Sequence, residues 1–72
     1  MILEVDDGGR LETIAVIGDS TDYVVNGRRF IGGYRLNASG YESIWFDKAV
    51  WDVTLLAEDA SLKTYRLTRK AS

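Results

Sequence analysis

The chain has 72 residues, of which 46% are hydrophobic and 28% charged, and its net charge at pH 7 is −2. This length predicts one small domain spanning residues 1–72, with the basic tail 69–72 as a candidate for disorder. The absence of histidine and cysteine excludes thiolate nucleophiles, disulfides, histidine acid–base chemistry and the softer metal sites.

Turn signals divide the chain at short, regular intervals. Asp6-Asp7-Gly8-Gly9 and Asn26-Gly27 are hairpin turns, and polar clusters at 18–22, 37–40 and 58–61 are further reversals. The intervening segments are rich in β-branched and aromatic residues, which predicts strands. We place these strands near 2–5, 10–17, 22–26, 28–36, 41–46, 49–57 and 62–69. The predicted fold is all-β, either a small antiparallel sheet or a partly closed barrel of 5–7 short strands.

The segment 44–58 leaves a second fold open. It has no glycine, and Trp45, Ala49, Val53 and Leu56 also fit a helical stripe that Ser43 would cap. Its β-branched residues favour strand. The alternative is an α+β fold, with one helix near 44–58 packed on an antiparallel sheet.

The stretch at 14–21, Ile-Ala-Val-Ile-Gly-Asp-Ser-Thr, contains a serine, Ser20, directly after an apolar run and Gly-Asp. It resembles the first sequence block of the SGNH (GDSL-type) esterases and lipases, in which that serine is the nucleophile. The resemblance implies a C-terminal Asp-x-x-His, and this chain has no histidine. We therefore predict a strand ended by a turn at Ser20, no catalytic residue and no enzyme activity. The acidic turns do not match the spacing of a calcium-binding EF-hand, so neither a metal nor a cofactor is expected.

Two neighbouring segments combine aromatic residues with arginine. From Arg28 to Arg35 we expect a strand with Phe30 and Tyr34 facing inward and arginine outward. From Tyr41 to Phe46, Ile44 and Phe46 share one face and Tyr41 and Trp45 share the other. A sheet this small buries one face well, so one aromatic set is expected near solvent. The candidate binding residues are Arg28, Arg29, Tyr34, Arg35, Tyr41, Trp45 and Arg66.

This composition predicts a non-enzymatic module that acts by protein–protein interaction, as an inhibitor, adaptor or assembly component. The alternative is a small nucleic-acid-binding β-barrel with Arg28, Arg29, Arg35, Arg66, Arg69 and Lys70 on its surface. Acidic and basic residues alternate in blocks along the chain, and we expect strands of opposite sign to lie side by side.

The sequence also allows expectations about the oligomeric state and the cellular location of the protein. A chain this short buries little apolar surface, which favours a homodimer. No apolar run is long enough to cross a membrane and the N-terminal segment lacks the basic start of a signal peptide. We expect a cytoplasmic protein, of the kind that phages and mobile elements often encode.

Overall fold

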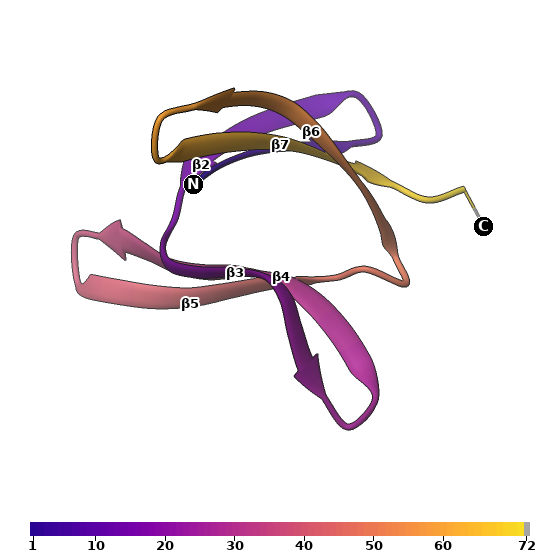
Figure 1. The fold of residues 1–72 in the computed structure, drawn as a ribbon, viewed down its shortest axis with the longest axis horizontal. Coiled ribbons are helices and arrows are strands. Elements are labelled where there is room, and N and C mark those ends of the chain that lie inside the picture. Colours follow the sequence, from indigo (N-terminus) through magenta and orange to yellow (C-terminus); the bar gives the residue numbers. More distant parts are fainter. Residues whose placement is uncertain (72) are drawn as a thin grey trace.

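The computed structural model describes residues 1–71, which form seven strands and no helix (Figure 1). No segment of this range is therefore a helix that could span a membrane. A four-stranded sheet has the order β2-β1-β7-β6, and a three-stranded sheet has the order β3-β4-β5. The strands are β1 (Ile2–Asp7), β2 (Arg10–Ala15), β3 (Ile17–Val25), β4 (Arg28–Asn37), β5 (Gly40–Asp47), β6 (Trp51–Asp59) and β7 (Leu62–Arg69).

The chain crosses between the two sheets twice. After the β1–β2 hairpin it passes through Val16 into the β3–β4–β5 meander, and after Asp47 it returns to the four-stranded sheet. Hydrogen bonds fix both crossings, since the Val16 amide donates to the Met1 carbonyl (2.9 Å) and the Lys70 amide to the Val50 carbonyl (2.8 Å). All neighbouring strands pair antiparallel except β1 and β7, which are parallel.

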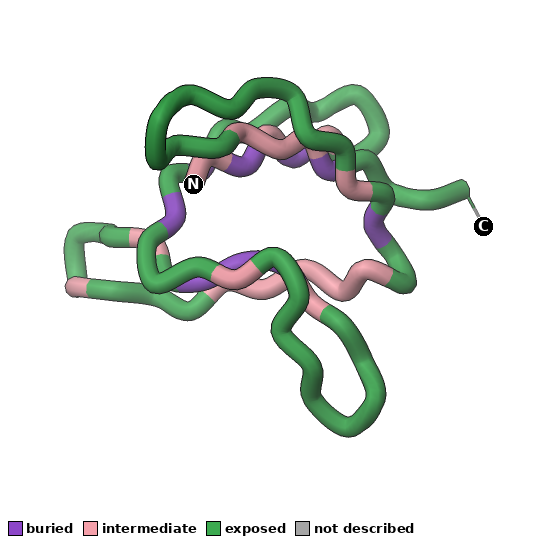
Figure 2. Tube along the Cα trace, viewed as in Figure 1, coloured by how far each residue is buried: buried purple, intermediate pink, exposed green. Residues whose placement is uncertain are grey.

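The core lies between the facing sheets, as the buried positions in Figure 2 show. Leu3 on β1, Ile31 on β4 and Leu67 on β7 are completely buried, because alternate residues of each strand point inward. Ile44 and Phe46 of β5 pack against this cluster. The remaining buried core residues are Val5, Ile14, Val16 and Trp51.

The all-β prediction is confirmed, and so are its hairpins. Asn26 and Gly27 both have positive φ, 51° and 77°, as a tight two-residue turn between β3 and β4 requires. The helix considered for 44–58 is wrong, because this segment forms the end of β5, a short connection and most of β6. The parallel pairing of β1 with β7 departs from a purely antiparallel sheet.

The turn predicted at 18–22 is wrong. The predicted strand 10–17 ends at Ala15, and the chain from Ile17 onward is already β3. Between Ile17 and Ser20, and again between Ser20 and Tyr23, β3 has one residue more than β4, which makes two bulges. Gly18, with φ of 57°, allows the first of them. The polar residues therefore bend a strand instead of ending it.

Candidate binding face

The outer face of the three-stranded sheet is largely apolar. Antiparallel partners lie on the same side of a sheet, and the pairs Ile17 with Tyr34, Tyr23 with Phe30 and Leu36 with Tyr41 all face away from the core. Trp45, opposite Gly32, belongs to the same side. We call this surface the aromatic face; its residues are Ile17, Tyr23, Phe30, Tyr34, Leu36, Tyr41 and Trp45.

The register overturns one expectation about β4. Ile31 is the residue of this segment that enters the core, at 0% exposure, so Phe30 and Tyr34 lie on the opposite, outer side. Arg35 shares the side of Ile31, which reverses the predicted orientation. The reason is the pair Gly32-Gly33: a Cβ on Gly33 would lie 2.6 Å from the Ile17 carbonyl oxygen and 2.7 Å from Val16 Cγ1. The chain crossing from β2 packs directly against this glycine.

One end of the aromatic face is built around Trp45. Its ring stacks on that of Tyr23 with the centroids 4.8 Å apart, and its Nε1 donates a hydrogen bond to Ser43 Oγ at 2.8 Å. Stacking and a hydrogen bond together hold a half-buried indole in one orientation. Tyr23 stands on the β3–β4 hairpin, which projects away from the sandwich in Figure 1.

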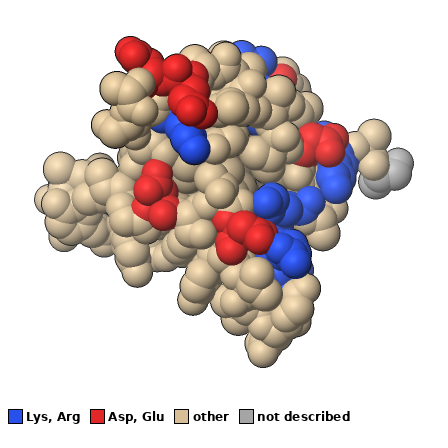
Figure 3. Space-filling model, in the orientation of Figure 1, with Lys and Arg blue, Asp and Glu red and all other residues tan. Residues whose placement is uncertain are grey.

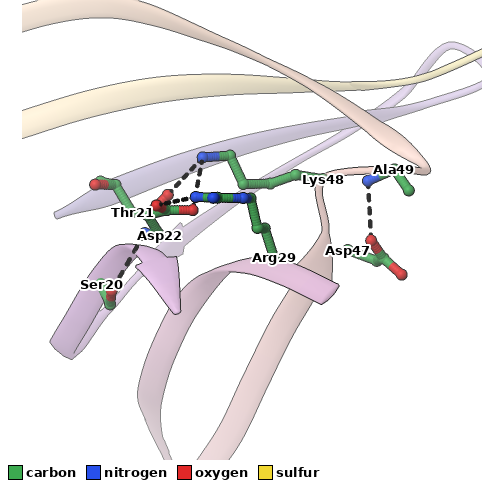
Figure 4. Close-up of polar contacts among 7 residues, drawn as sticks. All are labelled: Ser20, Thr21, Asp22, Arg29, Asp47, Lys48 and Ala49. Atoms are coloured by element: carbon green, nitrogen blue, oxygen red, sulfur yellow. Dashed lines mark hydrogen bonds and ion pairs between the residues drawn. The ribbon is translucent and has the colours of Figure 1, made fainter. Parts of the chain in front are cut away.

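Charged residues at the end of the sheet that carries Trp45 are paired with one another, and Arg29 lies on the inner side, which it shares with Ile31 (Figure 4). Arg29 Nη1 donates to Asp22 Oδ2 at 2.5 Å, and Lys48 Nζ donates to the Thr21 carbonyl at 2.8 Å. The hydrogen bond from Arg29 holds the pKa of Asp22 below its ordinary value.

A second carboxylate at this end is held by the β5–β6 connection. Asp47 accepts hydrogen bonds from the Ala49 amide at 2.9 Å and from Arg28 Nη2 at 2.6 Å. The backbone hydrogen bond from Ala49 and the guanidinium of Arg28, in that order, lower the pKa of Asp47. Both aspartates are therefore fully ionised at neutral pH.

The other end of the aromatic face is uncharged. Ile17, Tyr34 and Tyr41 line a shallow hollow of about 320 Å³ beside Gly18. Gly18 is required here because a Cβ would lie 3.3 Å from the Tyr34 ring on a backbone with positive φ. Leu36 is 70% exposed next to this hollow. We call Ile17, Tyr34, Leu36 and Tyr41 the hairpin patch, since three of them belong to the β4–β5 hairpin.

The remaining two predicted binding residues lie elsewhere. Arg35 points between the sheets, where it contacts Glu42 at 3.2 Å and Glu12 of β2 at 3.7 Å. Arg66 lies on the outer face of the four-stranded sheet, and its Nη2 contacts Glu4 Oε1 at 2.7 Å. The seven predicted residues therefore divide among the aromatic face, its charged border, the space between the sheets and the opposite surface.

The sequence-based interpretation omitted four residues of the aromatic face from the binding residues: Ile17, Tyr23, Phe30, which was expected to face inward, and Leu36. Leu36 had a usable signal, because it has the same parity as Tyr34 in the predicted strand 28–36. Ile17 and Tyr23 had none, since the two bulges break the alternation that would have connected them.

Most of the cations are neutralised by neighbouring carboxylates. Of the nine Lys and Arg residues, all within the described range 1–71, eight lie within 4.0 Å of a carboxylate and Arg10 does not. The predicted pairing of opposite-sign strands is confirmed by Arg66 with Glu4 and by Arg69 with Asp7, which join the basic C-terminal strand to acidic β1.

Ser20 does not have the surroundings of a nucleophile. Its Oγ accepts a hydrogen bond from the Asp22 amide at 3.2 Å, which is a local side-chain-to-backbone contact. Ser20 and Lys63 line one shallow surface hollow, but Lys63 is half exposed and pairs with Glu58 at 4.0 Å. A lysine that acts as a general base is normally buried away from water, and Lys63 is not. Among residues 1–71, no three acidic side chains gather in an arrangement suited to a metal ion.

The comparisons with known proteins return no matching family model, no curated protein and no solved structure.

Proposed function

We propose that this protein is a non-enzymatic binding module that engages a protein partner through the Trp45 end of its aromatic face. The observation that carries the proposal is the gathering of seven apolar side chains, five of them aromatic, on the outer side of a sheet whose inner side already packs on the core. Contiguous apolar surface of this kind on a small protein is typical of an interaction site.

The chemistry of the Trp45 end favours a protein partner. Tryptophan, tyrosine and arginine are the residues most enriched in interaction hot spots, and Trp45, Tyr23 and Arg28 lie together here. Trp45 and Tyr23 offer rigid rings for a partner's apolar side chains. The pair of Arg28 with Asp47 lies on the same side of the sheet and supplies a polar border that orients the partner.

Nucleic acid is the second candidate, and one observation favours it. Arg28, Arg29 and Lys48 gather at the end of the sheet that carries the stacked rings, with Arg28 on the side of the rings and Arg29 on the other side. All three are already paired with aspartates, and the protein carries a net charge of −2. Long-range attraction to phosphate is therefore weak, so this remains the alternative.

The experiment is capture from a cell lysate with the tagged protein, before and after nuclease treatment. Trp45→Ala is the test variant, and Leu56→Ala, which removes an apolar side chain with 46% exposure from β6, is the control. We expect a nuclease-resistant protein to be retained by the wild type and by Leu56→Ala and lost by Trp45→Ala. Equal retention by both variants would contradict the proposal.

The alternative has its own test. Binding to a fluorescent single-stranded oligonucleotide at low and at physiological salt measures phosphate contacts directly, because such contacts weaken steeply as salt rises. Absence of binding at about 50 mM salt removes the nucleic-acid candidate. Binding that falls steeply with salt and is lost in Arg28→Ala would replace the protein partner with a nucleic acid.

We place this activity in the cytoplasm. A chain without cysteine draws no stability from disulfides and is suited to a reducing compartment. Imaging of a fluorescent fusion in the source cell tests the location.

A further inference from the structure

The hairpin patch is chemically distinct from the Trp45 end of the same face. Its segment 36–41, Leu-Asn-Ala-Ser-Gly-Tyr, contains no charged residue, and the projecting β4–β5 hairpin shows neither acidic nor basic atoms in Figure 3. Leu36 and Tyr41 are 70% and 67% exposed, the former among the most exposed large apolar side chains of the molecule. Neither residue contributes to the core.

We infer that the hairpin patch is the contact surface of a symmetric homodimer. This goes beyond the proposed function, because the partner described above contacts the Trp45 end and the second copy contacts the hairpin end. In the dimer, Leu36 of each copy enters the hollow between Ile17, Tyr34 and Tyr41 of the other.

Self-complementarity is the first argument for a second copy. A twofold interface uses the same surface on both subunits, so that surface must carry both the protruding and the receiving element. The hairpin patch does, since exposed Leu36 lies beside an apolar hollow of about 320 Å³. A hollow of this size accommodates one aliphatic side chain.

Charge is the second argument. Two identical surfaces of one net charge repel each other, and a neutral surface carries no such penalty. The tip of the β4–β5 hairpin satisfies that condition. Nearby charges on Arg35, Glu12 and Glu42 are paired with one another, and Asp19, which follows Gly18, pairs with the amino group of Met1 at 3.2 Å.

Surface area is the third argument. The chain exposes 4945 Å², which is about a tenth more than the roughly 4,500 Å² expected for a compact monomer of its mass. The four exposed side chains of the hairpin patch offer about 500 Å², and the backbone and small residues around them bring the contact near the ~600 Å² per partner at which specific interfaces begin. An interface at the low end of the size range is typical of weak, transient association, so we expect a reversible dimer rather than a permanent one.

Sedimentation equilibrium from about 1 µM to about 300 µM tests the inference. The wild type should pass from monomer to dimer within this range. Leu36→Ser and Tyr41→Ser should each raise the dissociation constant at least tenfold. In a symmetric interface each substitution removes an apolar contact from both subunits, so its effect on the binding free energy is doubled. Leu62→Ser is the matched control: Leu62 is an apolar residue with 49% exposure at the start of β7, and its loss should leave the constant unchanged.

A monomer throughout this range would overturn the inference. So would a dimer that survives the combined Leu36→Ser and Tyr41→Ser variant. Circular dichroism of each variant establishes that the fold is retained. Because the chain has no cysteine, Ser39→Cys also provides a single labelling site at the hairpin tip. A spin label there should report one defined distance between subunits, and no such distance would contradict the contact.

The dimer and the proposed function fail separately. A monomeric protein that still loses its captured partner in Trp45→Ala refutes the dimer alone. A dimer whose capture does not depend on Trp45 refutes the proposed function alone.

Discussion

The two sheets of this protein resemble each other on their inner faces and differ on their outer ones. Inside, Leu3 and Leu67 of the four-stranded sheet face Ile31 of the three-stranded sheet, and all three are completely buried. Outside, the four-stranded sheet presents threonine and charged residues together with a few apolar ones: Glu4, Thr13, Asp52, Thr54, Thr64, Arg66 and Thr68, beside Ile2, Ala57 and Leu62. The three-stranded sheet presents five aromatic and two aliphatic side chains instead.

The difference between the two outer faces indicates which surface residues the fold requires. Threonine and paired charges are ordinary for the solvent side of a half-buried sheet. The outer side of the four-stranded sheet shows that the fold is compatible with such a surface. The aromatic face therefore has no structural necessity in the sandwich, and an interaction is the better explanation for it.

The largest expected effects lie on the inner faces, where the two sheets should be equivalent. Ile31→Ala and Leu67→Ala each remove a completely buried side chain, and each should lower the free energy of unfolding by about 2–5 kcal/mol. Urea denaturation followed by circular dichroism measures both. A much smaller loss for Ile31→Ala than for Leu67→Ala would break the equivalence of the inner faces.

A second difference is how closely neighbouring backbone segments approach each other. In the three-stranded sheet, a Cβ on Gly32 or Gly33 would collide with neighbouring backbone atoms, whereas Gly8 and Gly9 of the β1–β2 turn have open space around them. Gly33→Ala places a methyl group 2.6 Å from the Ile17 carbonyl oxygen, and overpacking of this kind should cost about 1–3 kcal/mol. Thr54→Ala, on the exposed side of the four-stranded sheet, should change stability by no more than about 0.5 kcal/mol. Chemical denaturation of the two variants compares them, and equal stabilities would show that the β2–β3 crossing does not pack against β4 in solution.

The charged pairs of Arg29 with Asp22 and of Arg28 with Asp47 should respond to acid. The folded-state pKa values of Asp22 and Asp47 lie below the ordinary value of 3.8. Their contribution to stability is therefore complete above that pH and is lost as the pH falls through the lower folded-state values. Thermal unfolding of Asp22→Asn and Asp47→Asn between neutral pH and strong acid should show a weaker acid dependence than the wild type. An unchanged pH dependence would mean that the pairs with Arg29 and Arg28 do not persist in solution.

The smallest effect is expected at Ser20. Ser20→Ala removes one exposed hydrogen bond to the Asp22 amide and should cost about 1 kcal/mol or less, with binding intact. Denaturation and the capture experiment measure the two properties side by side. Loss of activity with an intact fold would give this serine a role that its surroundings do not explain.

The sequence predicted the strands well because local signals define them. Asn26-Gly27 specifies a hairpin by the backbone conformations it allows, and alternation correctly separated Ile44 and Phe46 from Tyr41 and Trp45. The same alternation puts Tyr65 and Leu67 on one face of β7, and Leu67 is completely buried.

The failures occur where long-range packing decides. The bulged course of β3 around Ser20 depends on its pairing with β4, and polar residues with a glycine are equally typical of a turn. The orientation of the segment from Phe30 to Arg35 depends on Gly33 accommodating the crossing chain at Val16. The parallel pairing of β1 with β7 joins residues about sixty positions apart, for which no local pattern exists.

Hydroxyl-radical footprinting of the free and partner-bound protein tests the central claim most directly, because it reports which side chains a partner covers. The aromatic face predicts that oxidation of Trp45 and Tyr23 falls severalfold in the complex, while oxidation of Leu56 on the four-stranded sheet is unchanged. Protection of Leu56 with Trp45 and Tyr23 still reactive would place the partner on the other sheet and contradict the account.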